Sequence, residues 1–546
     1  MNNNNKILIA LLGISLGIAS CKKQLDITNT NQPTPQSAQN ETGVVSLAQG
    51  SIYRNGFYDL KYTDGVYGRF WSGATGFQEL MGDIVGAEAA NAYMNQIGCP
   101  NQVTLDNGTV VLNPSAINTQ YSLLRSINVN AQQGSNTTFY EWAYMYNMIT
   151  AANSVLKIAG NTTFSGTGAA TKKATVQAWA YWWKGYAYAR LGSIYYAGII
   201  QNAGTSDAST NGNYVSKEAI IAESNANFDK SAAALDLATS TADYTTILGK
   251  LIPSFLQQGK GGVLTISMWK HNINTMKARN ILVNTIVAAM TPAQWNNVLT
   301  LVNNGITSSD IIFTGRTDAN GDFLGTTLSD LVQSTGSNTN TYKLSERWVQ
   351  DFRAGDKRKD NNVYTLPSIG IFNTDRGNVF NTRYSLKGGG NGLAGVIVYS
   401  NTLAGANEIT LCGTYEENEL MKAEALIQTA QVATGLLSIN NVRTYQGAGL
   451  SAIGTGLTQA AAYEELRSER RIALAFKGLS FYDARRWDII APDKARTGCV
   501  VLSAAGVVSN NATIKYGYLD YWDVPDNELA YNPALPGSAA VVNPKK

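Results

Sequence analysis

The 546-residue sequence predicts an all-α protein in which a helical scaffold carries long irregular loops. In 139–156, FYEWAYMYNMITAANSVL, apolar residues recur at steps of three and four, and 172–196, KKATVQAWAYWWKGYAYARLGSIYY, repeats this pattern. Large aromatic residues alternate there with Ala and Gly, which is typical of closely nested helix hairpins of the tetratricopeptide type. Gly- and Asn-rich stretches at 98–138, 305–340 and 360–411 separate the apolar segments and predict the loops.

The same periodicity predicts further helices and a set of core tryptophans. Helices are expected at 44–54, 77–90, 215–237, 263–286, 292–304, 344–353, 414–430 and 458–477. No strict repeat of about 34 residues is visible, so the helix pairs would be degenerate. The tryptophans expected in the core are Trp142, Trp179, Trp183, Trp295 and Trp487.

The first 21 residues have the pattern of an export signal. A single basic residue, Lys6, precedes an apolar run from Ile7 to Ala19. This run is too short for a membrane span, which needs about 20 apolar residues, so residues 1–20 are predicted to be a signal peptide. The small residues before Cys21 indicate a lipoprotein signal, in which Cys21 becomes the lipidated N-terminus. A plain signal peptide with an accidental Cys is the alternative.

The rest of the chain is expected to be a short tether and one domain. Residues 21–40 are polar and contain two prolines, which is typical of a flexible linker. A single domain is predicted over 41–546, with an N-terminal half at about 41–240 and a C-terminal half at about 260–546.

Composition excludes several classes of function. Charged residues make up only 15% of the chain and the net charge is +3, which argues against a general nucleic-acid binder. The chain has one histidine, His271, so zinc sites with two or three imidazoles and most His-based acid–base pairs lack their parts. A packed or surface role is expected for His271. Beyond Cys21, the residues Cys99, Cys412 and Cys499 allow one disulfide at most.

Two short motifs match known patterns by letter. GNGLAG at 390–395 resembles a dinucleotide fingerprint, but no strand precedes it and VIVYS after it reads as a strand, so a loop is expected. Asp318, Asn320 and Asp322 of DANGD offer oxygen ligands for calcium. This stretch lacks the Gly and Glu of an EF-hand loop, and a plain turn is favoured. No metal or cofactor is otherwise expected, and the sequence selects no carboxylate pair for glycoside hydrolysis.

The stretch RSERRIALAFKGLSFYDARRWDI, 467–489, mixes charged and apolar residues along its whole length. Gly478 suits the end of a first helix, where positive φ is needed. Ser480, with Asp483 three residues later, predicts a capping box that starts a second helix.

Charges in the first of these helices lack partners within the helix. Arg467 and Arg471 are four residues apart, and so are Glu465 and Glu469, so like charges face each other. Arg470 points toward the packed side. Because an unpaired buried charge costs several kcal/mol, we expect a buried ion-pair network that joins two helices.

This stretch resembles the C-terminal signature of the SusD/RagB family, the surface nutrient-binding lipoproteins of Bacteroidetes. The matching residues are Glu469, Arg470, Arg471, Gly478, Asp483, Arg486 and Trp487. The chain departs from the signature at Ala473 and Lys477, where the family usually has acidic residues, so the partners of the network are left open. CKKQLD at 21–26 is similar to the lipidated start of the family, and FYEWAYMYNMITAANSVL to one of its helices.

The resemblance implies a fold and a function. The fold would be a SusD-like scaffold of four tetratricopeptide-like helix pairs outside the cell, anchored to the outer membrane by lipid. The protein would cap a TonB-dependent (SusC-like) transporter and capture an oligosaccharide, without being an enzyme. A peptide or another nutrient as ligand, or a surface glycoside hydrolase, are the alternatives.

Candidate ligand-binding residues follow from the chemistry of sugars, whose flat C–H faces pack on aromatic rings. Aromatic residues in loops are therefore the candidates, because those on helical stripes are expected in the core. They are Tyr62, Tyr67, Phe70, Trp71, Tyr93 and Phe323.

Overall fold

The structure is a computed structural model. It describes residues 39–54, 60–61, 67–68, 71–87, 94–115, 117, 119–131, 136–202, 211–316, 342–370, 381–401, 405–406, 408–503 and 505–545.

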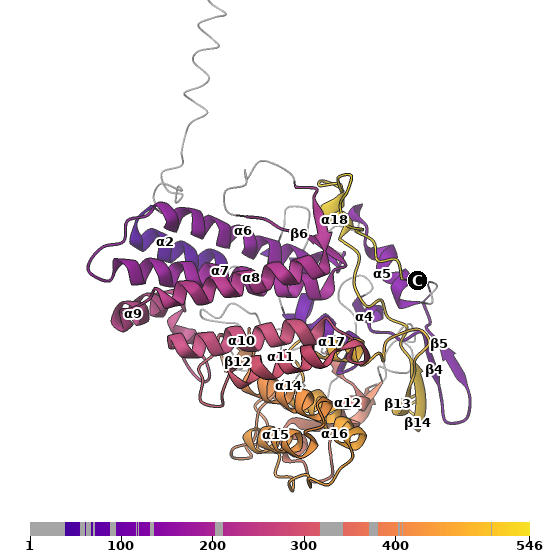
Figure 1. Cartoon of the computed structure of the whole chain (residues 1–546). Helices are drawn as coiled ribbons and strands as arrows, with labels where there is room; N and C mark the ends of the chain where they lie inside the picture. Colours follow the sequence, from indigo (N-terminus) through magenta and orange to yellow (C-terminus); the bar gives the residue numbers. More distant parts are fainter. Residues whose placement is uncertain are drawn as a thin grey trace, which may run out of the picture.

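Helices build most of the molecule (Figure 1). The longest are α6 (Phe139–Asn161), α7 (Ala169–Ile194), α8 (Lys217–Asp236) and α10 (Ile266–Val283). The others are α2 (Glu41–Leu47), α3 (Gly76–Met81), α4 (Met94–Ile97), α5 (Gln120–Ile127), α9 (Thr241–Leu251), α11 (Pro292–Asn303), α12 (Glu346–Gln350), α13 (Lys357–Asn362), α14 (Tyr415–Gln428), α15 (Val432–Tyr445), α16 (Gln459–Ala473), α17 (Ser480–Arg486) and α18 (Asp526–Leu529). Among the described residues, no helix combines the length and apolar character needed to cross a membrane.

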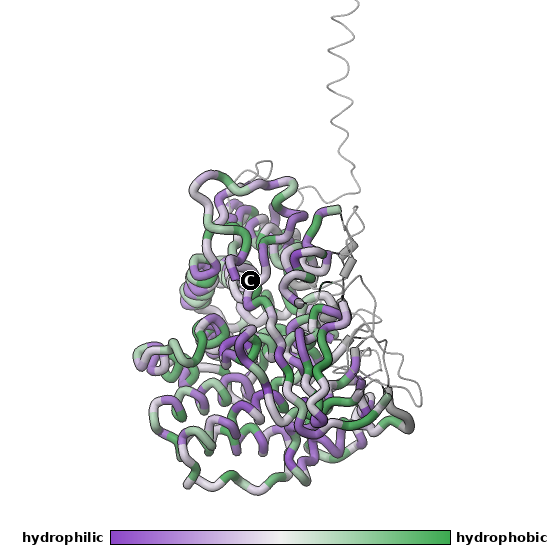
Figure 2. Tube along the Cα trace, turned by 90° about the vertical axis from the view of Figure 1, so that its right-hand side faces the viewer, coloured by the Kyte–Doolittle hydropathy of each residue, from purple (hydrophilic) through white to green (hydrophobic). Residues whose placement is uncertain are grey.

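Consecutive helices pack against each other as pairs. In the upper half of Figure 1, α7 lies between α6 and α8, and in the lower half α11 packs on α10 and α15 on α14. The helix α10 also contacts α7, α8 and α14, which connects the two halves. These pairs confirm the predicted SusD-like helical scaffold. In Figure 2 polar and apolar residues alternate along the helical part of the chain, as expected for helices with one buried side.

Small antiparallel sheets accompany the helices. The largest has the strand order β13–β14–β4–β5, with β4 (Gln102–Thr104), β5 (Val110–Leu112), β13 (Arg496–Leu502) and β14 (Val508–Lys515). The two-stranded sheets are β1 (Leu60–Lys61) with β2 (Tyr67–Gly68), β3 (Val85–Ala87) with β9 (Tyr342–Leu344), β6 (Ala197–Ile199) with β7 (Tyr214–Ser216), β8 (Thr314–Arg316) with β12 (Glu408–Thr410), and β10 (Val363–Gly370) with β11 (Thr382–Leu386). The predicted loops 98–138 and 360–411 therefore carry short strands.

Two local predictions are wrong. The helix expected at 77–90 ends at Met81, because the chain turns at Asp83 (φ 57°) and then pairs β3 with β9. The segment VIVYS, 396–400, forms no strand; it lies in an irregular loop, where the backbone N–H of Ile397 donates to Gln446 at the end of α15. In both places a tertiary contact outweighs the local pattern. The helices α5, α9 and α15 were not predicted, and α5 lies within the predicted loop 98–138.

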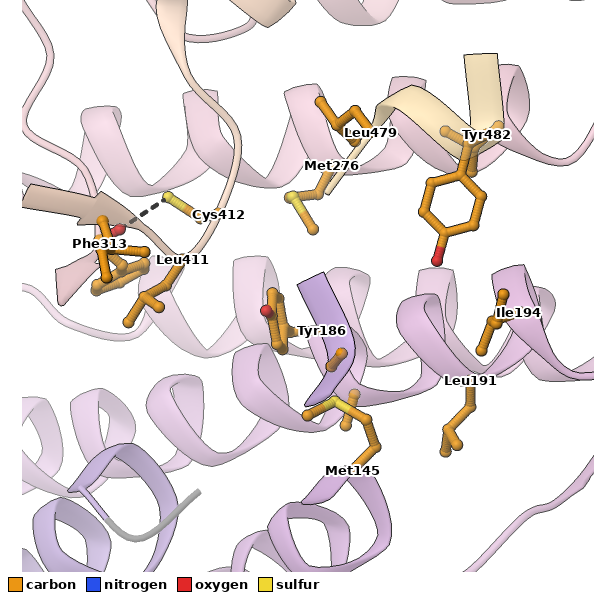
Figure 3. Packing of buried hydrophobic residues seen from close by; sticks show 14 of the residues in the cluster. Met145, Tyr186, Leu191, Ile194, Met276, Phe313, Leu411, Cys412, Leu479 and Tyr482 are labelled. Carbon is orange, nitrogen blue, oxygen red and sulfur yellow. Dashed lines mark hydrogen bonds between the residues drawn. The ribbon is translucent and has the colours of Figure 1, made fainter. Parts of the chain in front are cut away.

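Aromatic residues fill the core, and the predicted core position is confirmed for four of the five tryptophans. Trp142, Trp179, Trp183 and Trp295 are at most 5% exposed. The ring of Phe313 in the middle of the core lies 4.7–5.7 Å from the rings of Trp179, Trp182, Trp183 and Trp269. Figure 3 shows Phe313 beside Leu411 and Cys412, whose thiol donates to the Phe313 carbonyl. Cys99, Cys412 and Cys499 are all buried, and none of these three forms a disulfide.

The expectation that Trp487 belongs to the core is wrong, because this side chain is only partly buried. It caps the C-terminal end of α17 and lines a polar cavity. The guanidinium groups of Arg467 and Arg486 lie 5.0 Å and 5.3 Å from its ring, so cations cover the indole.

The ion-pair network predicted for 467–489 is present and buried. Arg470 donates to both oxygens of Asp483 at 2.9 Å and 3.0 Å. Arg486 donates to Asp483 at 2.7 Å and to both oxygens of Glu424 on α14 at 2.7 Å and 2.6 Å. Glu469 accepts from Arg358 on α13 and from Arg443 on α15. The network therefore ties α16 and α17 to three further helices.

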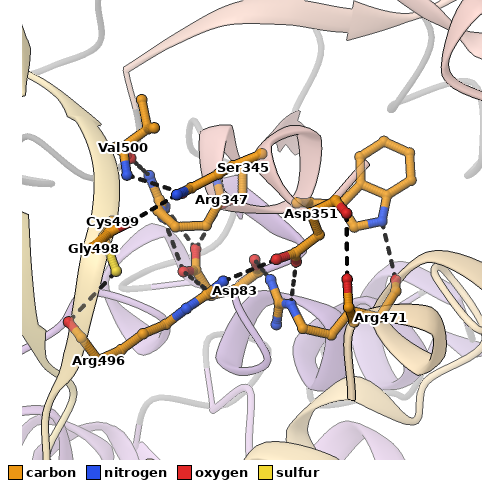
Figure 4. Close-up of polar contacts among 12 residues, drawn as sticks. Asp83, Ser345, Arg347, Asp351, Arg471, Arg496, Gly498, Cys499 and Val500 are labelled. Carbon is orange, nitrogen blue, oxygen red and sulfur yellow. Dashed lines mark hydrogen bonds and ion pairs between the residues drawn. The ribbon is translucent and has the colours of Figure 1, made fainter. Parts of the chain in front are cut away.

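A second part of the network joins this region to the N-terminal half. Figure 4 shows Asp83 between Arg347 and Arg496, and Asp351 next to Arg471 and Arg496. Arg471 also donates to the carbonyls of Gly82 and Asp83 at 2.9 Å and 3.1 Å. These contacts hold the end of α3 against α16.

The turn between α16 and α17 differs from the prediction in one respect. Gly478 has φ 73°, as expected of a residue past a helix end. The predicted capping box at Ser480 is wrong, because Leu479 is the N-cap and the Ser480 hydroxyl donates to the Gln78 carbonyl. The carboxylate of Glu79 instead accepts the N–H groups of Phe476, Gly478 and Leu479. A tertiary acceptor thus replaces the local cap.

We expect this network to make the protein acid-labile. Burial opposes the ionisation of Asp483 and Glu469, but the adjacent arginines outweigh it and lower the pKa of both carboxyls. Because these pKa values are lower in the folded state, their contribution to stability is complete above the unfolded values of about 4 and is lost as pH falls below them. Burial raises the pKa of Glu79 to about 7. This group therefore lowers the free energy of unfolding as pH rises from 4.5 to 7, and it has no such effect below pH 4.5.

Urea unfolding at a series of pH values measures this effect. The free energy of unfolding should fall steeply below about pH 4.5. The variant Asp483→Asn should be less stable than the wild type at pH 7 and should show a shallower acid loss. Equal pH dependence in both proteins would contradict the assignment.

Candidate functional site

A cavity of about 520 Å³ opens between β12, the start of α14, the end of α15 and the turn after α16. The loop 389–401 forms another wall. Five segments thus bring polar and aromatic side chains to one place. A concave surface with a few convergent polar groups is the usual form of a small-ligand site.

Two partly exposed tyrosines line this cavity beside the buried rings of Tyr399 and Phe476. Tyr415 is the first residue of α14 and Tyr445 is the last residue of α15, so the hairpin of these helices brings them together. Their ring centroids are 4.8 Å apart with an interplanar angle of 67°, and both side chains are partly exposed. Burial raises the pKa of Tyr415 to about 12 and also raises the pKa of Tyr445. Both phenols are therefore neutral hydrogen-bonding groups at physiological pH.

The carboxylate of Glu416 in the cavity is held by two hydrogen-bond donors. Glu416 accepts from Gln446 at 3.2 Å and from Lys477 at 3.3 Å. Burial opposes its ionisation, but Lys477 and the hydrogen bonds outweigh this and lower the pKa of Glu416. A general acid for glycoside hydrolysis needs a raised pKa, so Glu416 has the opposite property.

The opposite wall of the cavity is fixed by Glu408 on β12. This carboxylate accepts the backbone N–H groups of Lys260 and Gly261 at 2.9 Å and 3.0 Å, and it also pairs with Arg316. The ammonium group of Lys260 lies 5.1 Å from the centroid of the Tyr445 ring. The cavity therefore offers aromatic faces, phenol hydroxyls and oriented charges, which are the groups that bind a polyhydroxylated ligand.

None of the site residues predicted from the sequence is tested by this geometry. Tyr62, Phe70, Tyr93 and Phe323 lie outside the described residues, as do Cys21 and the calcium candidates Asp318, Asn320 and Asp322. For Tyr67 in β2 and for Trp71 only the backbone is described. Tyr415 and Tyr445 were missed, because the segment 414–430 was interpreted only as a helix and no helix was predicted at 432–445.

The described residues contain no group of three or more His, Cys, Asp or Glu side chains placed to hold a metal ion. His271 contacts Asp310 at 2.8 Å and Ser267 at 3.3 Å, so the single imidazole bridges α10 and the segment after α11. A packed role accounts for this residue.

The helical scaffold with small sheets places the protein in the class of SusD-like folds. Over 93% of the chain it resembles a SusD-like carbohydrate-binding protein from Bacteroides vulgatus, with 15% identity, a TM-score of 0.57 and 100% of that chain covered. It is also similar to surface glycan-binding protein A from Bacteroides thetaiotaomicron (12% identity, TM-score 0.54, 91% of this chain and 98% of that one). A third structure, solved with a xylogluco-oligosaccharide, matches at 14% identity and a TM-score of 0.54, over 92% of this chain and 100% of that one.

At these identities the structures establish the fold alone, and a family model adds sequence evidence. Residues 417–538 match the model of the SusD family. The chain is therefore similar to the SusD family over this segment and shares the SusD-like fold. No curated protein sequence matches the chain.

Proposed function

We propose that this protein is a cell-surface lipoprotein that captures an oligosaccharide and delivers it to a TonB-dependent transporter in the outer membrane. The SusD-like fold over 93% of the chain is the observation that carries this proposal. Two of the similar structures are described as carbohydrate- or glycan-binding, and a third was solved with an oligosaccharide. The Tyr415–Tyr445 cavity supplies groups that suit such a ligand.

A glycan array on the soluble domain, produced from about Gln24, tests the binding. We expect saturable binding to one class of oligosaccharide and no products after long incubation. Release of shorter sugars would instead indicate a glycoside hydrolase. Binding of peptides without any glycan would change the ligand class.

The lipid anchor is tested by the variant Cys21→Ala. Because a Cys is needed for lipidation, this variant should be recovered in the soluble fraction, whereas the wild type should fractionate with membranes. Cys99→Ala, which changes a buried thiol of the folded domain, is the matched control and should stay with the membranes. Membrane association of the Cys21→Ala variant would contradict the lipoprotein assignment.

The transporter partner is tested by the genes next to this one. A large TonB-dependent barrel encoded beside it should copurify with the full-length lipoprotein from detergent-solubilised outer membranes. If such a barrel is present and does not copurify, the delivery role is contradicted while glycan binding can still hold.

A further inference from the structure

A second cavity, of about 260 Å³, lies between α8, α10 and α11. Five of its twelve lining residues carry side-chain amides. They are Asn225, Asn280, Asn284, Gln294 and Asn297, and we refer to this cavity as the amide groove. It shares no lining residue with the Tyr415–Tyr445 cavity.

Asn280 lines the amide groove, and one atom of its side-chain amide is a buried acceptor without a partner among the described residues. Its side chain is 2% exposed, and its NH₂ group donates to the Ser224 hydroxyl at 3.0 Å and to Asn225 at 2.9 Å. The Ser224 hydroxyl donates its own proton to the Gly185 carbonyl at 2.7 Å, so the amide atom that faces it has to be a donor. This fixes the orientation of Asn280, and its Oδ1 has no hydrogen-bond partner in the described part of the protein. A buried acceptor without a partner is unfavourable, so the wall of the groove keeps one unmet hydrogen-bonding valence at Asn280.

The other amides add donors and acceptors. Gln294 uses its carbonyl oxygen to cap α11 at Thr291, and its NH₂ group meets no acceptor among the described residues. Asn297, one turn further along α11, is exposed, and its amide makes no hydrogen bond within the described ranges. Asn284 is held in place by bonds to Ser193 and to the Asn280 carbonyl. The groove therefore has fixed amides as well as free ones.

The charge of the amide groove indicates a neutral ligand. Among the described residues that line the groove, the ionised side chains are Lys217 and Glu218, and they form an ion pair with each other. Lys217 also covers the ring of Tyr521, at 4.7 Å from the centroid. Amides donate and accept hydrogen bonds without charge, which matches sugar hydroxyls that do both. An anionic or cationic ligand would meet no unpaired counter-charge here.

The amide groove continues into a neighbouring cavity of about 280 Å³. The two share Lys217, Asn284, Thr285 and Tyr521 as lining residues. A ligand longer than one ring can thus extend from Asn280 past Asn284.

We propose that the amide groove is a second saccharide subsite, which takes a neutral, hydroxyl-rich segment of the glycan. It rests on the proposed function and extends it: one chain would hold a glycan at two separate places. Two contacts on one long polymer would raise its apparent affinity over that of a short fragment, because the second contact forms within the complex.

Calorimetric titration with the oligosaccharide that the array identifies tests this proposal. The wild type should bind two molecules per chain, and the double variant Asn225→Ala/Asn297→Ala should bind one. Asn296→Ala, an exposed neighbour on the same helix that does not line the groove, is the matched control and should bind two. Equal melting temperatures of the three proteins would confirm that folding is intact.

The outcomes separate this proposal from the proposed function. One bound molecule in the wild type, unaffected by the double variant, overturns the amide groove while glycan binding stands. If the array finds no glycan, crystals soaked with xylotriose still test the groove: density for the sugar at Asn280 supports it. Ordered water alone at Asn280 overturns it.

Discussion

Replacing Arg486 with Ala should destabilise the protein by about 3–5 kcal/mol, because it leaves two buried carboxylates without their shared cation. The Arg486 side chain is 1% exposed, and its partners Glu424 and Asp483 are 0% and 4% exposed. Arg470→Ala, which removes the other partner of Asp483, should act in the same direction and should lower stability before it affects affinity. Urea unfolding at pH 7 measures both effects.

The matched control for this prediction is Arg467→Ala. Arg467 lies on the same helix as Arg470 but pairs with Glu464 at the surface, where the two side chains are 26% and 67% exposed. Exposed ion pairs contribute about 0–1 kcal/mol, so this variant should be nearly as stable as the wild type. If Arg486→Ala matched the control, the network would not be a source of stability. A stable Arg470→Ala variant that had lost ligand binding would place the network in the binding site instead.

The double variant Tyr415→Ala/Tyr445→Ala should weaken glycan binding by at least about tenfold, which corresponds to about 1.4 kcal/mol or more. It removes the two partly exposed rings of the cavity and their phenol hydroxyls, while the helices that carry the tyrosines remain. Calorimetric titration with the oligosaccharide identified on the array gives the dissociation constant. Tyr531→Ala, a tyrosine that is 75% exposed and does not line the cavity, should bind like the wild type.

The loop aromatics predicted from the sequence offer a competing location for the site. Substitution of Tyr67, Trp71, Tyr93 and Phe323 by Ala tests it directly. If these variants lost binding while Tyr415→Ala/Tyr445→Ala retained it, the ligand would bind at the loops. If all of them retained binding, both locations would be wrong.

Much of the helical scaffold could be predicted because helices bury one side at a regular spacing. The segment FYEWAYMYNMITAANSVL lies within α6, and the tryptophans Trp142, Trp179 and Trp183 are buried as the spacing predicts. Predictions failed where a distant segment competes with the local pattern. Ser480 does not cap α17, because its hydroxyl meets the carbonyl of Gln78, 402 residues away in sequence.

The Tyr415–Tyr445 pair shows which part of a site is hard to predict from sequence. Each residue stands at the end of a helix, and neither departs from an ordinary helical pattern. Their proximity follows once α14 and α15 are known to form a hairpin, because the start of one helix then lies beside the end of the next. Because a helix was predicted at 414–430 but none at 432–445, the hairpin that brings the two tyrosines together was not predicted. The unpaired acceptor of Asn280 could not be predicted from the sequence. The orientation of its amide depends on the hydrogen bond that the Ser224 hydroxyl donates to the Gly185 carbonyl.

Three features could be predicted from the amino-acid sequence alone: the helical class, the family resemblance and a buried ion-pair network at 467–489. These features depend on residue spacing and on the cost of an unpaired charge, which are local properties of the chain. The partners in this network, Glu424, Arg358 and Arg443, became known from the folded structure. The same is true of the cavity that Tyr415 and Tyr445 share. The reason is that ion pairs, cavities and hydrogen-bond directions arise between segments far apart in the sequence, and their geometry exists only after those segments have packed.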